Sequence, residues 1–354
     1  MADALTRLLA TRPWLLADGA TGTNLFASGL ASGDAPELWN VLHPDRVRAL
    51  ARSFVEAGAD IILTNTFGGT RYRLQLHQAA DRVRELNIAA VRIAREAASG
   101  ADHEVIVAGN IGPTGEILEP VGPLSADAAQ AAFAEQAAAL AEGGADVLWI
   151  ETLSSREELE AAIRGAATTG LPVIGTMSFD TNGRTMMALT PAELAGVQRA
   201  HGLLACGSNC GTGPPEVIAS LVNLATAANS DAILVAKANC GIPRFENGAI
   251  RYDGTPDLMA AYACMAYDAG ARIIGGCCGT TPEHLRAMHR ALETHARGTK
   301  PGIELIEAAF GKLSSGARAQ LNGQLDRAAG ASPDAVPRRV SGRRRTGAAH
   351  RTAE

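Results

Sequence analysis

Eight short apolar segments, each followed by an amphipathic and alanine-rich stretch, recur along most of this 354-residue chain. Each segment is rich in residues that favour strands, and each following stretch has the apolar spacing of a helix. The segments cover residues 15–22, 60–69, 104–113, 146–153, 172–180, 203–213, 232–241 and 272–281. Strands and helices that alternate in this way predict repeated βαβ units.

Three helical stretches end in nearly the same turn, which supports this regularity. The turns read EAGAD at 56–60, EGGAD at 142–146 and DAGAR at 268–272. A glycine just past a helix relieves the strain of a left-handed residue, as expected before a following strand. Continuously apolar strands such as DIIL and AILVA favour a parallel sheet covered by helices. Eight units predict a single (β/α)₈ TIM barrel over residues 1–312, with an open doubly wound sheet as the alternative.

The last part of the chain, residues 313–354, lacks this pattern. It is rich in alanine, glycine, serine and arginine, and from Asp326 to Glu354 it holds seven arginines against three acids. We expect a low-complexity, disordered and basic tail there. Contact of its VSGRRRTG stretch with an acidic partner is the alternative.

Charge and cysteine content limit the class of protein. The net charge is −5, and 19% of residues are charged, so we expect neither a nucleic-acid nor a membrane partner. The N-terminal apolar run is broken by Arg and Pro and resembles neither a signal peptide nor a membrane span, which predicts a cytoplasmic protein. Six cysteines then favour metal binding or catalysis over disulfides. Cys206 and Cys264 are expected to pack in the interior, whereas the role of Cys240 and the oligomeric state, a homo-oligomer included, stay open.

Polar side chains gather at the C-terminal ends of the predicted strands, where barrels of this type carry their chemistry. They are Asp18, Thr21, Thr64, Asn65, Thr66, Asn110, Glu151, Asp180, Asn209, Cys210, Asn239, Cys277 and Cys278. Glu151 directly follows the apolar run VLWI, and burying such an acid is costly without a cationic partner. We therefore expect Glu151 to hold an ammonium group.

Three of these residues, Cys210, Cys277 and Cys278, lie in glycine-framed turns that read GSNCGTG and GGCCGTT. Small neighbours allow the backbone to turn sharply, and strand ends in a closed sheet are near enough for sulfurs to share one tetrahedral Zn²⁺ ion. Three thiolates leave a fourth ligand position open, which is typical of a catalytic site. Simple packing of buried cysteines is the alternative.

Five motifs in this order make the chain resemble the homocysteine S-methyltransferase family over about residues 10–296. They are Asp18-Gly19-Ala20-Thr21-Gly22, Thr64-Asn65-Thr66-Phe67, Glu151-Thr152, Gly207-Ser208-Asn209-Cys210 and Gly275-Gly276-Cys277-Cys278-Gly279. The family includes betaine-dependent enzymes, S-methylmethionine-dependent enzymes and the homocysteine domain of cobalamin-dependent methionine synthase. The resemblance implies a (β/α)₈ barrel with Zn²⁺ bound by the three cysteines, and with Asp18 and Glu151 holding the amino acid part of homocysteine.

Further substrate contacts are expected around the same strand ends. Gly19 belongs to the first motif, and Thr66 and Asn110 are candidates to line the site or to form hydrogen bonds within the rim. A trimethylammonium donor is usually held against aromatic faces by cation–π attraction, although aromatic residues make up only 4% of the chain. Phe67 and Trp39 are the candidates for this contact, with a place in the core as the alternative for each.

These features predict an enzyme that methylates homocysteine. Bound Zn²⁺ would remove the thiol proton and orient the resulting nucleophile. We predict betaine as donor, with methionine and dimethylglycine as products, and keep S-methylmethionine or a methyl-corrinoid protein as alternatives. The sequence has no D-x-H-x-x-G corrinoid motif, so the corrinoid route needs a separate protein. All-sulfur ligation argues against a zinc hydrolase, and a non-catalytic zinc- or thiol-binding barrel is the remaining alternative.

Overall fold

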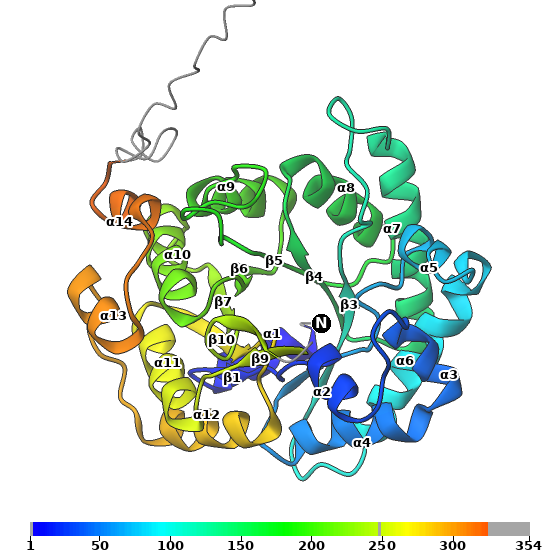
Figure 1. Cartoon of the computed structure of the whole chain (residues 1–354), viewed down its shortest axis with the longest axis horizontal. Coiled ribbons are helices and arrows are strands. Elements are labelled where there is room, and N and C mark those ends of the chain that lie inside the picture. The colour runs from blue at the N-terminus through cyan, green and yellow to red at the C-terminus, as the bar shows by residue number, and fades with distance from the viewer. Residues whose placement is uncertain (1–2, 247–248, 325–354) are drawn as a thin grey trace, which may run out of the picture.

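An eight-stranded parallel sheet occupies the centre of the molecule, with helices arranged around it (Figure 1). The computed structural model describes residues 3–246 and 249–324. In sheet order the strands are β1 (Leu15–Leu16), β10 (Ala271–Gly276), β7 (Ile233–Ala238), β6 (Ala205–Cys210), β5 (Val173–Met177), β4 (Val147–Leu153), β3 (Ile106–Ile111) and β2 (Ile61–Leu63). A parallel bridge between Ala17 and Ile61 joins the first and last of these strands. The predicted TIM-barrel fold is confirmed.

Most of the helices connect successive strands and cover the outside of the sheet, whereas the first helix precedes β1 and the last three follow β10. The helices are α1 (Ala4–Thr11), α2 (Gly22–Ala27), α3 (Trp39–Leu42), α4 (Pro44–Val55), α5 (Arg71–Gln75), α6 (Val83–Ala98), α7 (Ala126–Gly143), α8 (Arg156–Ala167), α9 (Pro191–His201), α10 (Pro214–Ala227), α11 (Pro256–Asp268), α12 (Pro282–Thr294), α13 (Ile303–Phe310) and α14 (Ser315–Leu321), with 3₁₀ turns at Pro36–Leu38 and Ala80–Arg82. Their apolar faces form one large core with the outward side chains of the strands.

The repeated glycine turns adopt the backbone conformation that their sequence predicts. Gly58, Gly144 and Gly270 have φ angles of 98°, 96° and 114°, a region that residues with a Cβ atom rarely enter. Each glycine lies one to three residues past the end of a helix and allows the chain to turn into the next strand. This regular connection places every strand C-terminus at the same end of the barrel.

The inside of the barrel is layered. Its lower layers are apolar and include Ile106, Val147 and Val235, which cluster with Leu5 and Leu9 of α1. Helix α1 therefore covers the N-terminal end of the strands. Side chains alternate along a strand, so the next inward positions toward the C-terminal end form a polar layer. This layer contains Asn110, Glu151, Thr176, Asn209 and Lys237.

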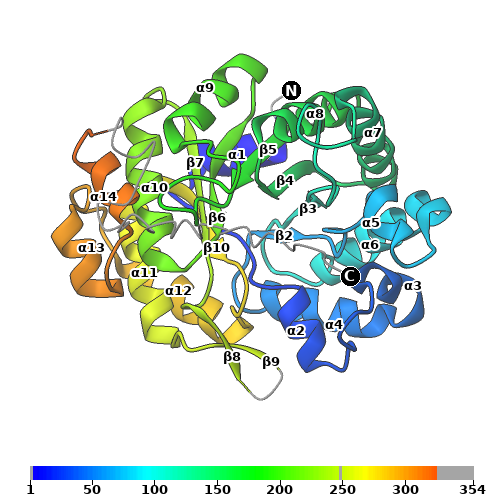
Figure 2. The same ribbon diagram turned by 45° about the horizontal axis from the view of Figure 1, so that its top comes forward.

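A two-stranded antiparallel hairpin, which sequence patterning did not predict, follows β7. Its strands are β8 (Pro243–Glu246) and β9 (Ala249–Tyr252). Figure 2 shows the hairpin projecting from the body of the barrel beside α12. It leads directly into α11 and brings Tyr252 back toward the strand ends.

The packed part of the chain extends beyond residue 312, the expected end of the barrel. Leu313, Ala317 and Gln320 are buried, and the Gln320 side chain donates a hydrogen bond to the carbonyl oxygen of Gly183 at 2.8 Å. Gly316 fits closely against Asn182, whose carbonyl oxygen would lie 2.0 Å from an added Cβ atom. The expectation of a disordered tail from 313 is therefore wrong for 313–324, because small residues there serve close packing. The rest of the expected tail lies outside the described residues.

Candidate metal centre

The three cysteines predicted as metal ligands meet at the C-terminal end of the barrel. Cys210 is the last residue of β6, and Cys277 and Cys278 directly follow β10. Their sulfur atoms all lie within 4.8 Å of one another, and each side chain is partly accessible. Tetrahedral zinc with Zn–S bonds of about 2.3 Å requires sulfurs about 3.8 Å apart. In the described part of the chain, these three cysteines form a group of neighbouring metal-ligating side chains.

Local backbone geometry explains how these sulfurs converge. Cys210 has a φ of 62° and Gly211 a φ of 73°, so β6 ends in a left-handed turn. Gly279, with a φ of 79°, forms the corresponding turn after Cys278. Left-handed backbone is unusual for a residue with a Cβ atom and is a recurrent feature of functional sites. The glycines next to the cysteines supply the freedom that these turns require.

Electrostatics favour a cation between the sulfurs. Hydrogen bonds to Cys277 and Cys278, together with burial, raise the pKa of Cys210. Hydrogen bonds from the other two thiols instead lower the pKa of Cys278 to about 3. Three thiolates this close repel one another, so the cluster would hold all three only with added positive charge. A divalent cation would supply this charge and replace the thiol protons.

Asparagine side chains support the turns around the cluster. Asn209 binds both the backbone amide and the hydroxyl of Thr152, at 3.2 and 2.7 Å, and its Nδ2 lies 4.0 Å from the Cys277 sulfur. Asn239 donates to the carbonyl oxygen of Gly211 at 2.5 Å. These contacts tie β4, β6 and β7 together below the sulfurs.

Two buried carboxylates and a buried lysine lie in the polar layer next to this cluster. Asp18 Oδ1 is 3.0 Å from Lys237 Nζ, and Asp18 Oδ2 accepts a hydrogen bond from the Leu63 amide at 2.7 Å. Glu151 Oε1 accepts a 3.0 Å hydrogen bond from Asn110 Nδ2. The side chains of Asp18, Glu151 and Lys237 are all more than nine-tenths buried.

Burial and mutual interaction shift the pKa values of these groups. Desolvation raises the pKa of Glu151 to about 7, against the opposing effect of Lys237. Desolvation also raises the pKa of Asp18. The pKa of Lys237 is raised despite burial, because Asp18 and Glu151 stabilise its positive charge. Lys237 therefore stays protonated, and Glu151 changes charge near neutral pH.

Three buried acceptor atoms at these strand ends have no hydrogen-bond partner. They are Glu151 Oε2, Asn110 Oδ1 and Asn239 Oδ1. A buried acceptor without a donor costs about 1–3 kcal/mol, so native proteins leave few of them. The concentration of three such atoms in one region is expected where a ligand with N–H or O–H donors binds.

The other predicted contact residues fall into different environments. Thr66 is fully buried and donates to the Asn110 carbonyl oxygen at 2.7 Å, so it orders the rim. Gly19 lies close to the Phe54 ring and to the Thr280 carbonyl oxygen, 2.7 and 2.8 Å from an added Cβ atom. Phe67 is half-buried beside Gly112.

The structure does not bring Trp39 to the cysteine cluster. Trp39 is 5% exposed and packs with Leu25, Leu30 and Val47 in a separate small core. The Arg46 guanidinium covers its ring at 5.1 Å from the ring centre. Trp39 is therefore a core residue, which was the alternative to a contact with the methyl donor.

Two residues of the site, Lys237 and Tyr252, were not singled out from the sequence. A charged residue inside the apolar strand AILVAKA was a usable signal for Lys237, because buried lysine requires a partner. Tyr252 is half-buried at the end of the unpredicted hairpin; it forms a hydrogen bond with Cys278, and its ring lies against Gly279. No periodic pattern marked Tyr252.

The remaining cysteines lie outside the cluster. Cys206 is fully buried in the core, and Cys264 is half-buried in α11. Cys240 is 1% exposed, and its thiol donates to the Gly254 carbonyl oxygen at 3.3 Å. Burial raises the pKa of Cys240 to about 11, which keeps it a neutral thiol.

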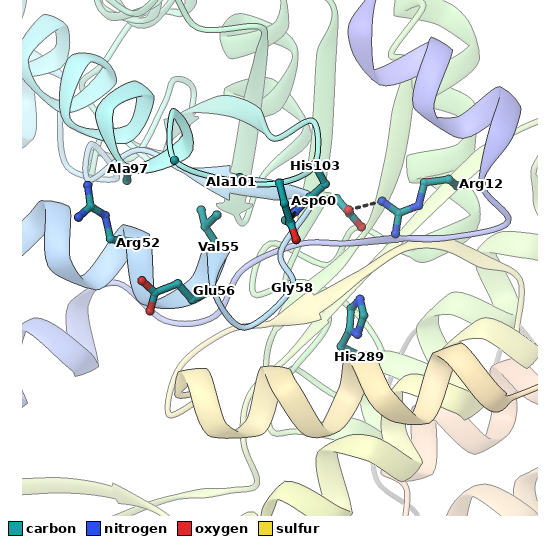
Figure 3. A pocket seen from close by; sticks show the side chains of 12 residues that line it. Arg12, Arg52, Val55, Glu56, Gly58, Asp60, Ala97, Ala101, His103 and His289 are labelled. Carbon is teal, nitrogen blue, oxygen red and sulfur yellow. Dashed lines mark hydrogen bonds and ion pairs between the residues drawn. The ribbon is translucent and has the colours of Figure 1, made fainter.

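A cavity of about 790 Å³ opens at the opposite end of the barrel, between α4, α12 and the loop before β3. Figure 3 shows Arg12 paired with Asp60 and His289 across from them. Asp60 also accepts a hydrogen bond from the Leu16 amide at 2.8 Å. These contacts join the N-terminal ends of the strands, the end that serves stability in this fold.

Comparison with known proteins agrees with the geometry of the cysteine cluster. The family model described as homocysteine S-methyltransferase matches residues 15–292. The chain belongs to the homocysteine S-methyltransferase family. The match includes all three clustered cysteines, both buried carboxylates and Lys237. The resemblance inferred from the motifs is thereby confirmed.

Two methionine synthases are among the relatives of this family member. Methionine synthase from Mycobacterium leprae is 32% identical over 303 residues, which cover 81% of this chain and 25% of that protein. The Mycobacterium tuberculosis methionine synthase is also 32% identical, over 78% of this chain and 24% of that protein. The chain thus spans about a quarter of the length of these relatives.

Solved structures support the same fold. The Escherichia coli homocysteine methyltransferase MmuM, in its oxidised form, has a TM-score of 0.69 and 25% identity, covering 82% of this chain and 99% of that one. Its metallated form gives a TM-score of 0.68 at 25% identity, over 81% and 99% of the two chains. Within the described part of this family member, no helix has the length and apolar character needed to cross a membrane.

Proposed function

We propose that this protein is a zinc-dependent enzyme that methylates the thiol of homocysteine, with betaine as methyl donor. One observation carries the proposal: three thiols share a small volume at the barrel mouth, next to a buried carboxylate that has a free acceptor oxygen. A thiol-bearing amino acid has the two groups that such a site would bind. Family membership supports the same reaction.

Cys210, Cys277 and Cys278 would hold the zinc ion. Their all-sulfur donor set and mutual distances suit Zn²⁺, and the three ligands leave a position for a fourth sulfur. Bound zinc supplies the positive charge that makes the substrate thiol ionise at neutral pH. The existence of a metallated form of the E. coli relative supports metal binding.

The amino group of homocysteine would bind at Glu151 and Asn110. Glu151 Oε2 and Asn110 Oδ1 are buried acceptors without donors, and an ammonium group offers three N–H bonds. The Asn110 amide keeps Glu151 in place through its 3.0 Å hydrogen bond to Oε1. Held at both ends, the substrate would present its sulfur toward the open side of the barrel.

Betaine suits the residues around the open side. As the thiolate sulfur bonds to the methyl carbon, the C–N bond breaks and its electron pair stays on nitrogen, so dimethylglycine leaves without a general acid. Tyr252, next to Cys278, and Phe67, at the rim, provide aromatic faces for the cationic donor. Likeness to methionine synthase favours a second candidate, in which a separate methyl-corrinoid protein supplies the methyl group. S-methylmethionine is the other small cationic donor with this chemistry.

A donor-by-donor assay tests the proposal. Purified protein with one zinc per chain is incubated with homocysteine and, in turn, betaine, S-methylmethionine or a methylated corrinoid protein, and methionine is measured. Methionine and dimethylglycine in equal amounts with betaine support the proposal. Formation of methionine only with another donor rejects betaine. Homocysteine binding without turnover by any donor would indicate a non-catalytic binding barrel.

A further inference from the structure

Lys237 is a buried cation that the proposed reaction does not yet use. It lies on β7 in the polar layer, 2% exposed, with its ammonium group 5.2 Å from the centre of the Trp149 ring. Burying a lysine is costly unless a counter-ion and hydrogen bonds compensate. Asp18 provides the counter-ion at 3.0 Å. The ammonium group has three N–H bonds, and this contact uses one.

The ion pair separates the roles of the two carboxylates. Each oxygen of Asp18 already has a donor, Lys237 for Oδ1 and the Leu63 amide for Oδ2. Glu151 has only Asn110 as partner, and its second oxygen has none. A substrate ammonium would therefore find an unsatisfied acceptor at Glu151, whereas Asp18 is occupied by the protein itself.

Charge balance gives Lys237 a second role. Asp18 and Glu151 carry two negative charges when both are ionised, and Lys237, which acts on both of them, would neutralise these charges together with a substrate ammonium. An α-amino acid brings an ammonium and a carboxylate on the same carbon atom, so its carboxylate must lie within a few ångströms of the Glu151 contact. Lys237 is a cation whose charge acts on Glu151, and both side chains lie in the same polar layer of the barrel.

We propose, on the basis of the function proposed above, that Lys237 is a specificity-determining residue. Its ammonium group takes Asp18 as counter-ion, leaves Glu151 to bind the substrate ammonium, and attracts the substrate carboxylate. Asp18 is then a positioning residue for Lys237. The site thereby selects a thiol that carries a complete α-amino acid group over a thiol that carries only an amine.

Binding of three thiols to the zinc-loaded protein tests this assignment. L-homocysteine carries both charged groups, 3-aminopropane-1-thiol lacks the carboxylate, and 4-mercaptobutanoate lacks the amine. Their Kd values are measured by calorimetry for wild type, Glu151→Gln, Lys237→Arg and the double variant Lys237→Met/Asp18→Asn. The double variant removes both charges of the pair, so that neither is left buried alone. Circular dichroism and zinc content show that each variant is folded and loaded.

Wild type should bind homocysteine about 10- to 100-fold more tightly than 3-aminopropane-1-thiol, the range expected for a charge-assisted hydrogen bond. The double variant should lose most of this ratio, and Lys237→Arg should keep it. Glu151→Gln should instead lose the preference over 4-mercaptobutanoate. An unchanged homocysteine to aminopropanethiol ratio in the folded double variant overturns the assignment, as does equal binding of these two thiols by wild type. Failure of zinc-loaded wild type to bind homocysteine at all would reject the proposed function itself.

Discussion

Asn110 donates its side-chain amide to one oxygen of Glu151 at 3.0 Å and leaves the other oxygen of that carboxylate without a partner. The two residues lie on neighbouring strands, β3 and β4, in the same inward layer of the barrel. A protein rarely buries a carboxylate with one oxygen unsatisfied. A polar group that loses water without gaining a partner lowers the stability of the folded state. This arrangement therefore indicates preparation for a ligand.

The ionisation of Glu151 should control substrate binding near neutral pH. Burial raises its pKa to about 7, and the charged form is the one that attracts an ammonium group. We expect kcat/KM for homocysteine to rise as pH increases through about 7, since kcat/KM reports ionisations of the free enzyme. Glu151→Gln should have at least tenfold lower kcat/KM and lose this pH dependence. An unchanged pH profile in the variant would assign the ionisation to another group.

The same substitution should stabilise the fold at alkaline pH. In the unfolded chain the pKa of the Glu151 side chain is near 4.5, so the folded protein binds this proton more tightly. The stability of the fold therefore decreases as pH rises from about 4.5 to 7. The shift corresponds to roughly 3 kcal/mol. Glu151→Gln should therefore unfold at higher denaturant concentration than wild type at pH 8, with little difference at pH 5. Glu158→Gln removes another buried carboxylate, which is hydrogen-bonded to Thr114 and whose pKa is also raised by burial, so it should act in the same direction.

Loss of one cluster sulfur should remove metal and activity together. In Cys210→Ala, two thiols remain, and we expect zinc content to fall from one ion per chain to less than about a tenth of that value, with methionine formation lost. Cys264→Ala, in helix α11, is the matched control and should keep both. Elemental analysis after dialysis measures the first effect. Full zinc content in Cys210→Ala would place the metal elsewhere.

Substitution of Tyr252 should weaken binding of the methyl donor and leave binding of homocysteine unchanged. Tyr252→Leu removes the aromatic face beside Cys278, and loss of a cation–π contact of about 1 kcal/mol should raise KM for betaine roughly fivefold or more. KM for homocysteine should change little. Trp39→Leu, by contrast, should lower stability and leave KM for betaine unchanged, because Trp39 packs away from the cluster. Steady-state kinetics with each substrate varied in turn separates these effects.

Shortening the chain should show that helix α14 belongs to the fold. Deletion of residues 325–354 removes only the part beyond the described structure, whereas deletion of 313–354 also removes buried Leu313 and the Gln320 hydrogen bond to Gly183. We expect the longer deletion to lose about 2 kcal/mol of unfolding free energy relative to the shorter one. Denaturant titration of both proteins measures the difference. Equal midpoints would mean that α14 adds no stability.

The barrel and its cysteine cluster could be predicted from the sequence because both depend on local patterns. Strand and helix periodicity repeats eight times, and Cys210, Cys277 and Cys278 each lie in a turn framed by glycine. The same alternation that identifies strands also places polar residues at one end of the barrel. These are properties of short segments and do not depend on long-range packing.

The roles of other residues depend on contacts between distant segments. Lys237 and Asp18 are 219 positions apart, and no local pattern shows that they form an ion pair. Trp39 lies in the segment after the first strand, where a contact with the site was expected, but its side chain packs with Leu25 in a small separate core. Helix α14 has the small residues typical of an unstructured tail, yet Gly316 needs that small size to approach Asn182.

Helix α1 has a consequence for the order of events during turnover. Because Leu5 and Leu9 cover the N-terminal end of the strands, a substrate would reach the polar layer from the opposite end. Under the proposed function, homocysteine, whose amino group would lie deepest, would enter before the methyl donor, which would bind nearer the opening. Methionine would then leave only after the demethylated donor, so the shape of the barrel would impose an ordered sequence.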